Sequence, residues 1–219
     1  MMKSKKFKFS EEQKERIRLA VADLEAASSG EIVPYYTAQS DDYEVARWKM
    51  AAVFGFLGAL ILGLASYFWL LPFSLTPFED ALFFILLMFL GFIIPLVYPA
   101  VSRSMVDSTI MKQKVFDRAT TVFLEEEIFK TRDRTGVLIY ISALEREVVV
   151  LADSGINKKV KPEDWQKIVN LVIAGIKANK VDEGLVNAIQ ACKKLLLDNG
   201  FTVRPDDKNE LPDNLRLED

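Results

Sequence analysis

The sequence contains no histidine and only one cysteine, Cys192. The lack of histidine excludes serine–histidine–aspartate and cysteine–histidine catalysis, histidine-ligated zinc or haem, and the usual proton shuttle at neutral pH. One cysteine cannot form a disulfide within the chain, which suits a reducing compartment. The helical spacing of Cys192 from Leu185, Ile189 and Leu196 predicts that it is a buried packing residue. Any chemistry would therefore depend on carboxylates, lysine, arginine, hydroxyls or the backbone.

An excess of charge of one sign is also missing, because the formal net charge is only −3. No long basic run follows Lys8, so the composition gives no electrostatic reason to expect a nucleic-acid partner.

Two stretches lack charge altogether, namely residues 50–78 and 81–102. Each is longer than the roughly 20 apolar residues that a helix needs to cross a bilayer. The sequence therefore predicts a transmembrane helical hairpin over 50–102, with helices at about 50–71 and 81–101. A pair of soluble core helices is the alternative, but such helices seldom stay uncharged beyond about 14 residues.

The basic residues beside the hairpin predict its orientation. Arg47 and Lys49 precede it and Arg103 follows it, whereas the turn carries only Glu79 and Asp80. Because positive residues favour the cytoplasmic side, we expect a two-pass protein of the inner (plasma) membrane with both termini in the cytoplasm. The lipid bilayer is then the first expected partner.

Glycines in the first helix leave a homo-oligomer through the hairpin as an open alternative. Gly55, Gly58 and Gly63 are small enough to let helices approach each other, although the first two are one residue short of the usual spacing.

The remaining sequence predicts one soluble domain that the hairpin interrupts. Period and capping patterns give the order helix, strand, hairpin, helix, strand, strand, helix, helix. This order is typical of an α/β (α+β) fold in which helices flank a small mixed sheet. The expected segments are a basic N-terminal tail at 1–9, a split cytoplasmic domain at 10–49 and 103–200, and a disordered acidic tail at 201–219.

A candidate site follows the strand expected to end at Ala152. Asp153 leads into Ser154 and Gly155, a loop whose backbone donors could hold an anion and whose oxygens could bind a hard cation. Asp41 and Asp42 follow the first strand and could converge there, which would make calcium or magnesium the expected ion.

Structural roles for the same aspartates are the alternative, and the pattern favours them. Asp153 can simply begin a turn, and the pair Asp41 and Asp42 can cap the helix that leads into the membrane.

Several short motifs occur in an order and spacing that resemble the TPM domain. The similarity extends over roughly residues 11–200 and is greatest to a bacterial membrane-protein subgroup. The motifs are Gly30-Glu31-Ile32-Val33, residues 135–142, residues 146–153, Ser154-Gly155-Ile156, Glu183-Gly184-Leu185 and Ala188-Ile189.

The resemblance implies a compact α/β sandwich and a role in the assembly or repair of membrane complexes. A plant member of the family is described as an acid phosphatase that binds calcium. Glu31 belongs to the family motif and is therefore a binding candidate, although its place at a strand start predicts exposure. Pro162 stands where many members carry an aspartate, and the histidines common in the bacterial subgroup are absent.

Two functions are consistent with these observations. The first is a membrane-tethered, non-catalytic interaction or assembly factor for a membrane complex, whose protein partner the sequence does not identify. The second is a calcium- or magnesium-dependent acid phosphatase acting on phosphomonoesters, with Asp153 as the candidate catalytic residue; this alternative rests on family analogy alone.

Overall fold

The computed structural model describes residues 7–70, 76–206 and 209–218. The chain divides into two compact units, a hairpin unit of residues 42–111 and a sheet unit that combines 6–41 with 112–219. The elements are α1 (Glu11–Glu25), β1 (Glu31–Thr37), α2 (Glu44–Tyr67), α3 (Pro77–Val97), α4 (Pro99–Met105), α5 (Ser108–Glu125), the 3₁₀ turn η1 (Ile128–Lys130), β2 (Gly136–Ser142), β3 (Glu147–Ala152), α6 (Ser154–Asn157), α7 (Pro162–Lys177), α8 (Val181–Asp198) and β4 (Arg216–Glu218). The expected mixed α/β class is confirmed.

The sheet has four strands in the order β3-β2-β1-β4. β1 and β2 are parallel over their whole length, from Glu31 opposite Gly136 to Thr37 opposite Ser142. β3 returns antiparallel to β2, and β4 adds to the outer edge of β1 as a short parallel strand. Every residue of β1 and β2 is buried, as expected for strands covered on both faces.

Pro34 explains why only the end of β1 carries an outer partner. The amide of Glu31 donates to Thr135 of the β2 side, whereas the amide of Ile32 points the other way and donates to Glu25. By the alternation of a strand, the nitrogen of Pro34 also points away from β2. β4 pairs only with Tyr35, Tyr36 and Thr37, so the missing donor removes no ladder bond.

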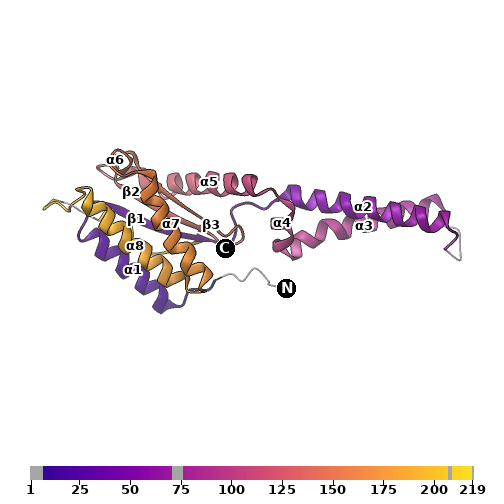
Figure 1. The fold of residues 1–219 in the computed structure, drawn as a ribbon, viewed down its shortest axis with the longest axis horizontal. Coiled ribbons are helices and arrows are strands. Elements are labelled where there is room, and N and C mark those ends of the chain that lie inside the picture. The colour runs from indigo at the N-terminus through magenta and orange to yellow at the C-terminus, as the bar shows by residue number, and fades with distance from the viewer. Residues whose placement is uncertain (1–6, 71–75, 207–208, 219) are drawn as a thin grey trace. The chain divides into compact units, whose positions relative to one another are not determined.

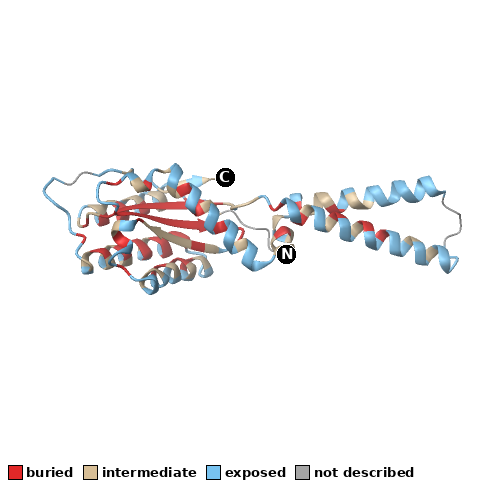
Figure 2. Ribbon diagram, turned by 90° about the horizontal axis from the view of Figure 1, so that it is seen from above, coloured by how far each residue is buried: buried red, intermediate tan, exposed pale blue. Residues whose placement is uncertain are grey.

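Helices cover both faces of the sheet (Figure 1). α1, α7 and α8 pack on one face, where Ile17, Leu24, Ile168 and Leu185 belong to the same core cluster as Ile139, each at 2% exposure or less. Each such side chain stabilises the fold by about 1.5–3 kcal/mol through burial. Figure 2 shows β1 and β2 as the buried centre of this unit.

The second face has a smaller core beneath α5 and η1. Val115 and Val122 of α5 and Ile128 of η1 pack against Val33 and Leu138 of the sheet. The helical segment that follows α3 is divided into α4, α5 and η1. The break precedes α5, where the side chain of Asp107 accepts a hydrogen bond from the amide of Thr109.

The hairpin unit consists mainly of α2 and α3, which are long and apolar enough to span a membrane, with mean hydropathy 2.0 and 2.6. Only 17% and 11% of their most apolar windows are buried, unlike a soluble core helix. Glycines let the two helices approach each other. A methyl group on Gly58 would lie 2.1 Å from Leu87, and one on Gly91 would lie 2.7 Å from the carbonyl oxygen of Met50.

The two ends of the chain differ from the expected tails. Residues 1–6, which hold most of the basic tail, lie outside the described residues, but Phe9 is buried and the Phe7 amide donates to the Tyr36 hydroxyl. The prediction of a disordered tail at 201–219 is wrong where Phe201 is buried and Arg216–Glu218 forms β4. Composition alone could not indicate these contacts, because they depend on residues far away in the sequence.

Candidate functional site

The direction of the strands determines which candidate residues lie together. Thr37 and Ser142 end β1 and β2 side by side, so Asp41 follows the carboxyl end of the parallel pair. β3 runs back along β2 and places Ala152 opposite Val137, so Asp153 lies at the amino end. Seven-residue strands separate the two ends by about 20 Å. The expected convergence of Asp153 with Asp41 does not occur.

At the amino end, Asp153 begins α6. Its Oδ1 accepts a hydrogen bond of 2.5 Å from the Ser154 amide, and its Oδ2 lies 3.5 Å from Nη1 of Arg134. The amide of Gly155 donates to the carbonyl oxygen of Arg134 at 3.0 Å, and a side chain at Gly155 would collide with the carbonyl of Asp133. The backbone donors expected to bind an anion are therefore used within the loop.

At the other end, the two aspartates after β1 form ion pairs. Asp41 lies 2.8 Å from Nζ of Lys114 within the sheet unit, and Asp42 lies 3.7 Å from Arg47 within the hairpin unit. Over the described ranges, histidine, cysteine and carboxylate side chains form no group of three that could hold a metal. The separated carboxylates therefore do not fit the expected calcium or magnesium site.

A buried polar network that the sequence analysis missed closes the carboxyl end. Ser40 Oγ lies 2.9 Å from Ser142 Oγ and 3.0 Å from the Tyr140 hydroxyl, and Ser142 donates to Glu145. The Ser40 amide donates to the same carboxylate at 3.1 Å. Ser142 and Glu145 are only 0% and 3% exposed, so this serine–carboxylate pair is closed to a substrate and fixes the loop after β1.

A pair of carboxylates at the amino end is the second feature that was missed. Glu31, expected to be exposed, is only 7% exposed. Its two carboxylate oxygens accept hydrogen bonds from the amides of Glu210 and Leu211 at 3.2 and 3.3 Å. Glu25 of α1 shares a hydrogen bond with Glu31 and accepts another from Asn209 at 3.1 Å. The only sign of this pair in the sequence was an acidic residue, Glu31, at the start of a predicted strand.

Burial changes the protonation of this pair. Burial, and then the charge of Glu31, raise the pKa of Glu25 to about 9. Burial also raises the pKa of Glu31, although the amides of Glu210 and Leu211 oppose the shift. Asp213 and Glu210 add further negative charge nearby. At neutral pH, Glu25 is therefore protonated and donates a hydrogen bond to Glu31.

An open groove of about 480 Å³ lies between α1 and α8. Leu19, Ala20 and Val186 provide its apolar part. Its charged residues have partners nearby, since Arg16 pairs with Asp182 and Asp23 pairs with Lys193.

The Glu25 proton predicts a pH-dependent stability. The raised pKa means that the folded protein holds a proton that the unfolded chain releases above about 4.5, so the contribution of Glu25 to stability is greatest below that pH and declines until about 9. Glu25→Gln should remove a slope of up to about 1.4 kcal/mol per pH unit. Thermal melting at pH 5–9 checks this, with Glu12→Gln at an exposed site of α1 as control. Parallel pH profiles for wild type and Glu25→Gln would contradict the assignment.

Comparison with known proteins gives two matches. Residues 104–195 match the model of the TPM domain, which includes β2, β3 and α7. The solved NMR structure of the BA42 protein from the bacterium Bizionia argentinensis is similar in fold, with a TM-score of 0.60 and 22% identity over 98% of this chain and 99% of that chain. No curated protein matches the sequence significantly. The chain therefore carries a TPM domain over residues 104–195.

Proposed function

We propose that this protein is a membrane-anchored interaction domain, which binds and helps to assemble a membrane-protein complex without chemistry of its own. The observation that carries the proposal is the insertion of an exposed apolar hairpin between β1 and β2, two strands that pair directly. An apolar surface of this extent requires lipid or protein around it. Both ends of the hairpin lead into the same folded unit.

The short connection to the hairpin supports a partner in the membrane. Only residues 38–43 separate β1 from α2. A fully extended segment of that length spans about 20 Å, so the sheet unit stays near the membrane surface. Tethering raises the effective concentration of the domain for a membrane-bound partner without any new contact.

The alternative, a metal-dependent phosphomonoesterase, finds less support in the geometry. Such an enzyme needs oxygen ligands that converge on the ion. Asp153 and Asp41 lie at opposite ends of the sheet and pair with Arg134 and Lys114.

A homo-oligomer through the hairpin stays a prediction. Gly55, Gly58 and Gly91 already serve contacts between α2 and α3, whereas a methyl group on Gly63 would meet no described atom within 4 Å. Gly63 is therefore the glycine of α2 that is best placed to meet another helix.

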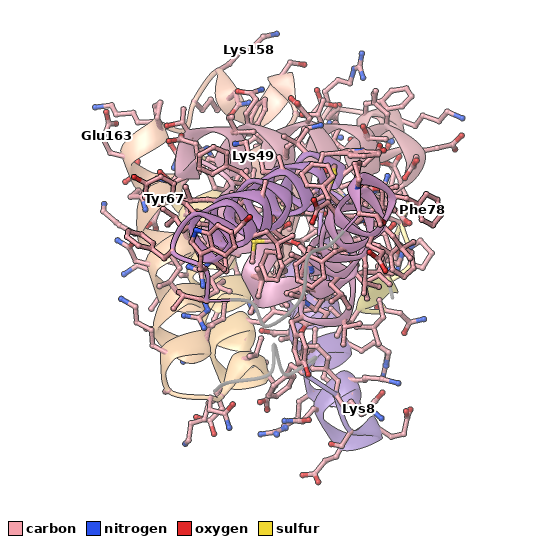
Figure 3. The ribbon with its side chains drawn as sticks, turned by 90° about the vertical axis from the view of Figure 1, so that its right-hand side faces the viewer. Lys8, Lys49, Tyr67, Phe78, Lys158 and Glu163 are labelled. Atoms are coloured by element: carbon pink, nitrogen blue, oxygen red, sulfur yellow. The ribbon has the colours of Figure 1, made fainter. Side chains whose placement is uncertain are left out.

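The proposed orientation can be tested by cysteine labelling. A membrane-impermeant maleimide applied to intact cells should label Thr76→Cys beside the turn and should leave Lys158→Cys unlabelled until the cells are permeabilised. Figure 3 shows the Lys158 side chain extending away from the ribbon, and the native Cys192 is buried and should add no background. Labelling of Lys158→Cys alone in intact cells would reverse the orientation.

The interaction itself can be tested by photo-crosslinking in membranes. A photoreactive amino acid would replace Leu19, Phe116 or Leu171, which are exposed on α1, α5 and α7. At least one position should give a discrete adduct with a membrane protein. A version in which a glycine–serine linker replaces residues 50–102 should lose that adduct, provided that its circular dichroism shows a folded sheet unit.

Catalysis would contradict the proposal. We expect detergent-purified protein to hydrolyse phosphomonoesters no faster than a mock preparation, with or without calcium or magnesium. Metal-dependent turnover that Asp153→Asn abolishes would instead establish the phosphatase alternative and place its site at the amino end of the sheet.

A further inference from the structure

The outer edge of β1 is covered by the end of the chain itself, residues 209–218, which we call the strap. The strap crosses the amino end at Glu31, where its amides donate to the carboxylate, and then pairs with Tyr35–Thr37 as β4. Leu211 contacts the core beneath α5, and Leu215 contacts the core on the opposite face. The strap therefore has contacts on both faces and along the edge.

Two ion pairs with α5 and the segment after it fix the register of the strap. Arg216 Nε lies 2.8 Å from the carboxylate of Glu126, and Glu218 accepts from Nη2 of Arg118. Arg216 and Glu218 are two positions apart, so they point to the same face of the strand. Arg118 also pairs with Glu125 at 3.0 Å, which would keep its side chain in place without the strap.

The strap is held by few of the contacts that stabilise the fold. β4 has three residues, against seven in the β1–β2 pair. None of the residues 209–218 is buried, and Leu217 is 48% exposed. Removing the strap would therefore leave both cores largely intact while exposing unpaired backbone groups of β1.

We propose that the outer edge of β1 is a docking site for an extended segment of a protein partner, and that the strap is a self-ligand which this segment displaces. The inference rests on the proposed interaction function and identifies its surface. Strand addition of this kind obtains affinity from main-chain hydrogen bonds and specificity from side-chain sites along the edge.

The binding positions that the strap occupies along the β1 edge determine which side chains a partner segment needs. The segment should be extended and should carry a basic residue for Glu126 and an acidic residue two positions later for Arg118. A leucine-like residue should directly precede the basic one, at the place of Leu215.

The acidic position is the most specific of these requirements. Burial lowers the pKa of Arg118, but the hydrogen bond and charge of Glu218 outweigh it and raise the pKa overall. Burial, and then the charge of Glu218, raise the pKa of Tyr35 to about 12, so its hydroxyl stays protonated at neutral pH. The Arg118 guanidinium and the Tyr35 hydroxyl can thus both donate to a carboxylate at the position of Glu218.

Peptide binding to the full-length protein in detergent tests the proposal. The probe is a fluorescent peptide with the sequence of residues 209–218, and fluorescence anisotropy reports its binding. Glu218→Arg should release the strap and bind the peptide at least about tenfold more tightly than wild type, because a charge-assisted hydrogen bond is lost from the competing strap. Leu217→Ala changes an exposed residue of the same strand and should bind like wild type.

A second variant tests whether Arg118 binds the acidic residue of the peptide. Adding Arg118→Ala to Glu218→Arg should abolish the gain in affinity, while hydrogen exchange of β2 shows that both variants are folded. Equal peptide binding by wild type and Glu218→Arg, or a gain that survives Arg118→Ala, would overturn the proposal.

Two further results separate the outcomes. A wild-type dimer in light scattering that the peptide dissociates would make a second copy of this chain the occupant and overturn the choice of a separate partner. A membrane-protein adduct at Leu19, Phe116 or Leu171 without peptide binding would refute only the β1 edge. Peptide binding without any adduct would refute the proposed membrane function instead.

Discussion

The parallel pairing of β1 with β2 is the constraint on which the rest of the structure depends. It joins seven buried residues on each strand across the insertion of residues 38–135, which contains the whole hairpin. Because the entropy of closing a loop grows only with the logarithm of its length, such an insertion costs little more than a short one. Without this pairing, β1 would have only the three residues of β4 as a partner. The apolar hairpin is thus built into the middle of a fold instead of being attached to one end.

The sequence was informative where the signal was local. The uncharged runs predicted the two apolar helices, and the Ser10–Gln13 capping box that begins α1 is present. The relative direction of β1 and β2 was not predicted, because it depends on contacts between residues about one hundred positions apart. The relative direction of these strands decides whether Asp153 and Asp41 converge. The sequence therefore identified the candidate residues but could not show that they lie far apart.

The two ends of the sheet consequently have different properties. At the carboxyl end, buried hydrogen bonds among Ser40, Ser142 and Glu145 fix the loop that leads toward the hairpin. At the amino end, Glu25 and Glu31 share a proton and hold the amides of the strap. A polar tail with two prolines has the composition of a disordered segment, and its contacts with distant residues of β1, α5, the two cores and these carboxylates give it order. A loop fixed by buried hydrogen bonds at one end of the sheet and an edge that we propose to be removable therefore coexist in one small domain.

The central claim, that segments on both sides of a lipid-embedded hairpin form one sheet, can be measured by amide hydrogen exchange of the full-length protein in lipid nanodiscs. The account predicts that the amides of β1 and β2 exchange at similar rates, as the slowest group of the sheet unit, because neither strand can open without the other. The interiors of α2 and α3 should be protected as well, since lipid excludes water from them. Fast exchange in β1 beside a protected β2 would contradict the account.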